Sequence, residues 1–287
     1  MLRLPWVAFA VLSIVLVPAV SSAAPLLWYT FDEASGNALD YGDAPAADAT
    51  LEGGATRSSN TPSGLGSSLD LRNDAPYAHA LDGDANKLDG LTAVTLTTWL
   101  NVEQYTSGNH RLISKQASGA FGGFSWNMNA TPVDGPVGPD NFKLAIFLGN
   151  NVSSGPADFT SGFSTADVDA HDQWVFLAVT YDSTQASNNT KFYIGDVNTP
   201  LTQLGGSLSL AQLTLDGGAA RVGVGFTDAA PAANTSVIGL QDDVRVYGEA
   251  LSLEALEAVR FAGTIPEPSS LLLVLTAVAM RPRRRRA

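Results

Sequence analysis

Short apolar stretches alternate with turn-forming residues along most of the chain. Between positions 25 and 263, glycine, asparagine, aspartate, serine and proline recur at short intervals. In TAVTLTTWLNV (92–102), polar side chains and Trp99 face one way and an apolar row faces the other. That row consists of Val94, Leu96, Leu100 and Val102. Such alternation predicts a half-buried β-strand.

Further segments repeat this pattern. DNFKLAIFLGN (140–150) places Phe142, Leu144, Ile146 and Leu148 on one face. The stretch 173–182 is apolar on both faces, which predicts a central strand covered on both sides. The stretches 190–196, 220–226 and 242–248 alternate again. The pattern predicts an all-β fold, a sandwich of two antiparallel sheets.

One short helix is predicted near the end of this region, over residues 251–261. Ser252 is a suitable N-cap, acidic residues occupy the first turns, and Arg260 lies near the end, in keeping with the helix dipole. We expect this helix to pack onto one end of the sandwich.

The N-terminus has the three parts of a secretory signal peptide. Arg3 precedes an apolar run from Trp6 to Val17, and small residues follow up to Ala24. Cleavage after Ala23 is expected, because Pro25 would obstruct a cut one residue later. The alternative is a membrane anchor that is retained.

The C-terminus holds a second apolar run. Ser269–Met280 comprises twelve residues, which as a helix would span about 18 Å of a hydrocarbon core of about 30 Å. A basic cluster follows it, made of Arg281, Arg283, Arg284, Arg285 and Arg286. The positive-inside rule would hold these arginines in the cytoplasm and leave the rest of the chain outside.

The tripeptide Pro266-Glu267-Pro268, the apolar helix and the arginine cluster together resemble the PEP-CTERM sorting signal of exopolysaccharide-producing bacteria. The resemblance implies transient anchoring in the membrane, followed by cleavage near this tripeptide by an exosortase. A simple tail anchor is the alternative. The predicted organisation is therefore a signal peptide (1–23), a β domain (24–263) and a sorting segment (264–287).

Charge narrows the possible partners of the β domain. Residues 25–280 hold ten basic and 28 acidic residues, a net charge of −18. Such a domain repels phosphate backbones, so nucleic acid is excluded as a partner. The chain has no cysteine, which excludes disulfides, thiolate metal sites and a cysteine nucleophile.

Five segments of the β domain resemble LamG-like jelly-roll domains of the concanavalin A-like lectin and glucanase superfamily. They are LLWYTFDEASGNALDYG (26–42), VTLTTWLNV (94–102), RLISKQ (111–116), WVFLAVTYD (174–182) and GLQDDVRVYGEALSLEALEAV (239–259). The resemblance implies two antiparallel sheets, one of them concave, and a binding or adhesive role.

Catalytic motifs are absent from the sequence. Glycosidases of this architecture use two carboxylates at same-face spacing, and no E-x-D-x-E run occurs. Three of the glutamates, Glu249, Glu254 and Glu257, fall at the predicted helix or just before it. The histidines are widely spaced, and no nucleophile elbow or phosphate loop is present. The sequence therefore predicts a protein that is not an enzyme.

Calcium is the one inorganic partner that the sequence allows. The loop 81–90 starts like an EF-hand but has Lys87 where glycine is required. Asp32 and Asp242 form a second candidate, because first and last strands often pair, and relatives of this fold hold calcium between them. Alternation places Asp242 on the inward face with Val244 and Val246. Hydrogen bonding to a neighbouring turn is the alternative to a metal.

For glycans, the sequence offers aromatic rings amid glycine and asparagine in the segment 104–141. Trp126, Tyr105 and Phe124 are the candidate binding residues, with packing in the core as the alternative. We therefore expect an exported surface or matrix protein that binds carbohydrate or neighbouring surface proteins. A purely structural matrix component and a glycan-cleaving enzyme are the alternatives.

Overall fold

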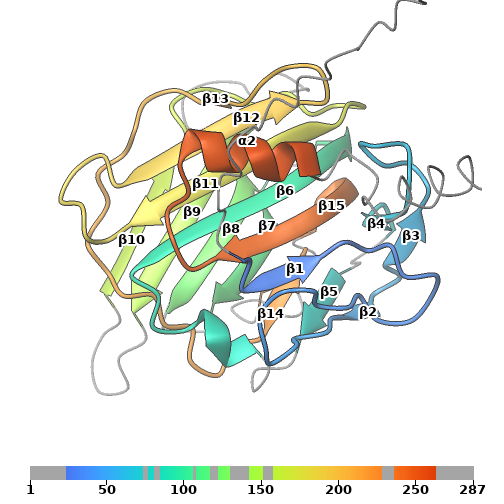
Figure 1. The fold of residues 1–287 in the computed structure, drawn as a ribbon, viewed down its shortest axis with the longest axis horizontal. Coiled ribbons are helices and arrows are strands. Elements are labelled where there is room, and N and C mark those ends of the chain that lie inside the picture. Colours follow the sequence, from blue (N-terminus) through green and yellow to red (C-terminus); the bar gives the residue numbers. More distant parts are fainter. Residues whose placement is uncertain are drawn as a thin grey trace, which may run out of the picture.

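In a computed structural model, two antiparallel β-sheets pack face to face (Figure 1). The structure describes residues 24–73, 77–80, 85–105, 108–116, 122–129, 142–150, 158–227 and 236–262. The signal peptide and the sorting segment, with Ala23, Pro266, Glu267, Pro268 and the arginine cluster, lie outside the described residues.

The eight-stranded sheet has the order β13-β12-β11-β6-β15-β4-β3, and β1 also pairs with β15. Its strands are β1 (Leu27–Tyr29), β3 (Thr56–Ser58), β4 (Ser68–Asp70), β6 (Ala93–Gln104), β11 (Val175–Asp182), β12 (Thr190–Asp196), β13 (Thr202–Gln203) and β15 (Ile238–Tyr247).

The seven-stranded sheet has the order β10-β9-β8-β7-β14-β5-β2. Its strands are β2 (Thr50–Glu52), β5 (Tyr77–Ala80), β7 (Asn109–Gln116), β8 (Gly123–Asn129), β9 (Lys143–Asn150), β10 (Asp158–Phe163) and β14 (Val222–Val224). A 3₁₀ turn, η1 (Asn86–Leu88), precedes β6.

The main core lies between the two sheets and contains the apolar rows that alternation predicts. The row of β6 and the row of β9 both belong to it in full. In β11, Val175, Leu177 and Val179 face this core, while Phe176 and Ala178 belong to a second cluster on the opposite face. The prediction that this strand is covered on both sides is therefore confirmed.

Helix α2 (Leu253–Ala262) forms that second cluster by lying across the outer face of the eight-stranded sheet, over β6 and β11 (Figure 1). Leu256 and Val259 pack there with Trp99, whose ring meets Phe176 edge-on at 5.4 Å. Each such fully buried apolar side chain contributes about 1.5 to 3 kcal/mol. The Ser252 hydroxyl accepts a hydrogen bond from the amide of Ala255 at 3.2 Å, which confirms the predicted N-cap.

The sequence-based fold is thus confirmed as an all-β sandwich of two antiparallel sheets with one short C-terminal helix. In the described part of the chain, no helix is long and apolar enough to cross a membrane.

Candidate functional site

Of the three aromatic residues expected to bind a glycan, two are fully buried and Tyr105 is partly buried. Trp126 and Phe124 are fully inaccessible and belong to the main core. Tyr105 packs its ring against Phe142 at 5.7 Å, and its hydroxyl accepts a hydrogen bond from the amide of Ala170. The prediction of a binding platform at Trp126 and Phe124 is wrong, because alternation along β8 turns both inward.

The same alternation turns the polar residues of β8 to the outer face of the seven-stranded sheet. Asn127 lies opposite Arg111 of β7, and Ser125 lies opposite Ser114 of β7 and Phe147 of β9. Residues directly opposite in antiparallel strands share a face, with Cβ atoms about 4.5 to 5.5 Å apart. Amide, hydroxyl and guanidinium groups therefore lie beside a phenyl ring, although Ser114, Ser125 and Asn127 are fully buried.

Three phenylalanines gather at the edge of this surface. Phe147 stacks on Phe159 with ring centroids 6.0 Å apart, and it meets Phe163 edge-on at 6.3 Å. Phe159 is 41% exposed, so part of the cluster is open to solvent. We call this surface the β7–β10 face, and define it by Arg111, Ser114, Ser125, Asn127, Phe147, Phe159 and Phe163.

Two hydrogen-bond donors on this face have no partner. The Asn127 Nδ2 and the Arg111 Nε are buried without a hydrogen bond. Other atoms of the two side chains are engaged: the Asn127 Oδ1 accepts from Ser125 at 2.7 Å, and the Arg111 Nη1 donates to the carbonyl of Asn109. Burial lowers the pKa of Arg111.

A polar groove lies on the other side of the molecule, between the β11–β12 hairpin and the start of α2. It has a volume of about 650 Å³, and Gln185, Asn189, Gln203 and Ser252 line it with other residues. Its amides are already engaged, because Asn189 donates to Leu210 at 2.8 Å and Gln203 donates to Gly205 at 3.1 Å. These side chains hold the local loops, which makes the groove a weaker candidate than the β7–β10 face.

The two predicted calcium ligands, Asp32 and Asp242, do come near each other, but not as expected. A β-bulge shifts the register between Asp242 and Arg245, and Asp243 adopts a positive φ of 49°. Asp242 therefore pairs with Trp99 on the outer face instead of sharing the core face of Val244. The expectation that Asp242 points inward with Val244 and Val246 is wrong.

Two carboxyl groups of this corner, those of Asp242 and Asp32, have a raised pKa, mainly because they are buried. Burial and the charges of Asp243 and Asp32 hold the pKa of Asp242 well above its usual value. Asp243 itself is paired, since Arg245 donates to it at 2.8 and 2.9 Å and the Trp28 indole donates at 2.6 Å. Asp32 accepts a hydrogen bond from the Ser67 amide at 2.7 Å.

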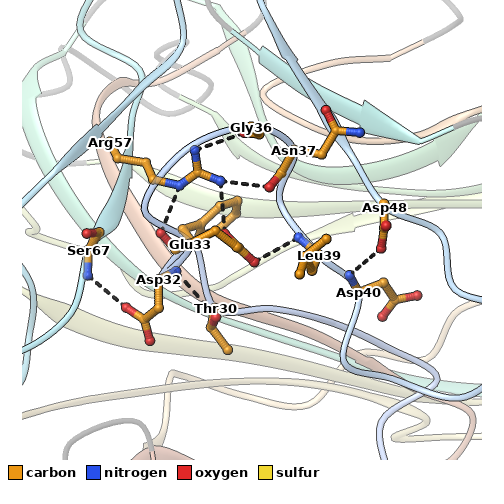
Figure 2. A network of polar contacts seen from close by, with 11 residues as sticks. Thr30, Asp32, Glu33, Gly36, Asn37, Leu39, Asp40, Asp48, Arg57 and Ser67 are labelled. Atoms are coloured by element: carbon orange, nitrogen blue, oxygen red, sulfur yellow. Dashed lines mark hydrogen bonds and ion pairs between the residues drawn. The ribbon is translucent and has the colours of Figure 1, made fainter.

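Beside this corner, Arg57 of β3 is surrounded by oxygen atoms of the loop 31–39 (Figure 2). Its guanidinium donates to the carbonyls of Phe31, Gly36 and Asn37 at 2.9 to 3.0 Å and to the Glu33 carboxylate at 2.9 Å. The Glu33 carboxylate also accepts from the amide of Leu39. One cation thus fixes a loop that belongs to no strand.

Comparison with known proteins assigns the chain to a family. The family model of the concanavalin A-like lectin/glucanases superfamily matches residues 73–256. The chain belongs to this superfamily. A comparison with curated proteins gives no match.

Solved structures with the fold of this concanavalin A-like domain include domain 4 of AbnA, a GH43 extracellular arabinanase of Geobacillus stearothermophilus, in complex with arabinotriose. It is 15% identical with a TM-score of 0.50, and the match covers 84% of this chain and all of that one. The receptor-binding domain of botulinum neurotoxin mosaic serotype C/D is 15% identical with a TM-score of 0.52, over 83% of this chain. The binding domain of Paraclostridial Mosquitocidal Protein 1 is 9% identical with a TM-score of 0.51, over 83% of this chain.

This chain spans about half the length of the two toxin binding domains, 51% and 52%. At these identities the likenesses show the shared fold.

The residues of this concanavalin A-like domain do not fit a calcium site at Asp32 and Asp242. Among the residues that the structure describes, no three His, Asp or Glu side chains are grouped to hold a metal ion. Carbonyl and carboxylate oxygens, the ligands that calcium prefers, do converge nearby, but on the guanidinium of Arg57. Arg57 supplies the positive charge there.

Proposed function

We propose that this protein is an exported, non-catalytic domain that binds carbohydrate through the β7–β10 face. The observation that carries the proposal is the juxtaposition on this face of amide, hydroxyl and guanidinium groups with a partly open phenylalanine cluster. Sugars present hydroxyl groups at the ring edge and apolar C–H groups on the ring faces, so a surface of this composition complements both.

The fold supports this proposal. Domain 4 of the arabinanase, which shares the fold, was solved in complex with arabinotriose. Regular strands carry the polar groups of the β7–β10 face, which holds these groups in fixed positions relative to one another.

A non-catalytic role is supported by the contacts of Glu257 and the position of Glu254. Glu257 is held by two hydrogen bonds from Arg260 and one from the Leu201 amide, and the Arg260 bond lowers its pKa. Glu254 lies in the first turn of α2 and is exposed, a common place for a helix-stabilising charge. A lowered pKa at Glu257 is the opposite of the raised pKa that a general acid in glycoside hydrolysis needs.

Export rests on the two ends of the sequence. The signal peptide would direct the chain out of the cytoplasm, and the PEP-CTERM segment would hold it in the membrane until an exosortase cuts near Pro266. The protein would then reside at the cell surface or in the extracellular matrix. We expect the protein recovered from the cell envelope to have the mass of a chain without residues 1–23 and without the last twenty or so. An intact mass that includes both ends would contradict export and sorting.

Binding is tested by titrating the purified protein against a panel of oligosaccharides, including arabino-oligosaccharides and fragments of the host exopolysaccharide. Selective, saturable binding of one class is the expected result. Absence of binding throughout the panel, with self-association of the protein, would favour the purely structural role. Release of new reducing ends during the titration would show an enzyme and contradict the non-catalytic proposal.

A further inference from the structure

The unpaired donors of Arg111 and Asn127 are neighbours on the β7–β10 face. The two residues lie directly opposite each other in β7 and β8, with side chains on the same face. Both orphaned groups are N–H donors, the Arg111 Nε and the Asn127 Nδ2. Buried donors in folded proteins nearly always have an acceptor, so this pair indicates an acceptor that the chain itself does not provide.

Arg111 also differs from four other described arginines in its charge partner. Arg57, Arg72, Arg245 and Arg260 each form an ion pair with a carboxylate. Arg111 is in no ion pair, although the β domain as a whole has a large excess of acid. Among the described residues, its side chain donates one hydrogen bond, to the carbonyl of Asn109.

An anionic acceptor with two oxygen atoms fits these donors better than a single hydroxyl. A carboxylate accepts from a guanidinium through charge-assisted hydrogen bonds, and its second oxygen can accept from a neighbouring amide. Phe147 lies opposite Ser125, two residues along β8 from Asn127, so its ring is placed to contact the sugar that bears the carboxylate.

We propose that the β7–β10 face binds a carboxylated glycan, such as one built from uronic acids, with its carboxylate held by Arg111 and Asn127. This proposal rests on the proposed function, because it names the class of sugar that the same face takes. The net negative charge of the domain does not oppose it at short range, since charges farther away than about 8 Å are largely screened at physiological salt. The contact with Arg111 is buried and is screened far less.

The test uses uronic acid oligosaccharides, each paired with its carboxyl-reduced form, which has the same sugars without the charge. Affinities are measured by calorimetry for the wild type, Arg111→Gln and Asn127→Asp. Arg72→Gln is the matched control, because Arg72 is an arginine of another surface that pairs with Asp70.

For the wild type and Arg72→Gln, we expect the acidic form to bind at least about tenfold more tightly than the reduced form. In Arg111→Gln the two forms should bind equally, and a thermal midpoint close to that of the wild type shows that this variant is folded. Asn127→Asp should weaken the acidic form more than the reduced one, because it places a like charge at the carboxylate.

Equal binding of both forms by the wild type would overturn the carboxylate proposal and leave carbohydrate binding intact. A wild type that binds neither form of any pair, and no sugar of the wider panel, would overturn both.

Discussion

Replacing Arg57 with alanine is expected to lower the free energy of unfolding by about 3 kcal/mol. The substitution leaves the Glu33 carboxylate, whose side chain is only 9% exposed, without its counter-charge, and it removes the donor to three loop carbonyls. Urea denaturation followed by tryptophan fluorescence measures the change. Arg57→Lys keeps the charge but cannot reach four acceptors from one nitrogen, so we expect it to fall between the wild type and Arg57→Ala.

The same variants test the calcium question. The thermal midpoint of the wild type should be the same with calcium as with a chelator, because Arg57 supplies the cation at this loop. A midpoint that rises with calcium in the wild type would show a site that the described residues do not reveal. An Arg57→Ala protein as stable as the wild type would contradict the role given to the guanidinium.

Replacing Trp126 with alanine is expected to cost about 3 to 5 kcal/mol of stability. The ring is fully buried in the main core opposite Ile113 and Ile146, and its removal leaves a large cavity. The indole Nε1 has no hydrogen-bond partner, so Trp126→Phe loses no hydrogen bond and should cost only about 1 to 2 kcal/mol.

Glycan binding separates the two possible roles of Trp126. A core residue predicts that Trp126→Phe binds sugar as the wild type does. If Trp126→Ala kept its stability and lost binding, Trp126 would have to be a surface residue that contacts the sugar. That result would contradict the description of β8.

The strands themselves could be predicted from the sequence, because burial of one face imposes alternation. The rows of β6 and β9 were found in this way, and so was the double coverage of β11. Strand β8 is harder to predict from the sequence. Its polar positions, Ser125 and Asn127, are fully buried, and the glycine and asparagine around Trp126 are residues typical of a loop.

Features that depend on the pairing of distant strands could not be predicted. The bulge that turns Asp242 outward arises where β15 pairs with β6. The residues next to Asp243 in the sequence do not predict its positive φ. Arg57 reaches a loop more than twenty residues earlier in the chain. Arg111 and Asn127 become neighbours only through the register of β7 and β8.

The position of Phe147 could be predicted from the sequence nearby. Alternation in the stretch 140–150 places it on the face of β9 that points away from the apolar row. Its neighbours in the structure are Phe159 on β10 and Ser125 on β8. They could not be predicted without the order of the strands in the sheet. The sequence therefore pointed to aromatic side chains, but the structure buries Trp126 and Phe124 and leaves Phe159 partly exposed instead.

Binding of sugar by the β7–β10 face is tested most directly by repeating the oligosaccharide titration with Phe159→Ala and Tyr41→Ala. Both residues are exposed aromatics, 41% and 52% accessible, but Tyr41 lies beside Trp28 of the other sheet. We expect Phe159→Ala to weaken binding about three- to tenfold and Tyr41→Ala to leave it unchanged. Binding that survives loss of Phe159 and fails with loss of Tyr41 would contradict the account.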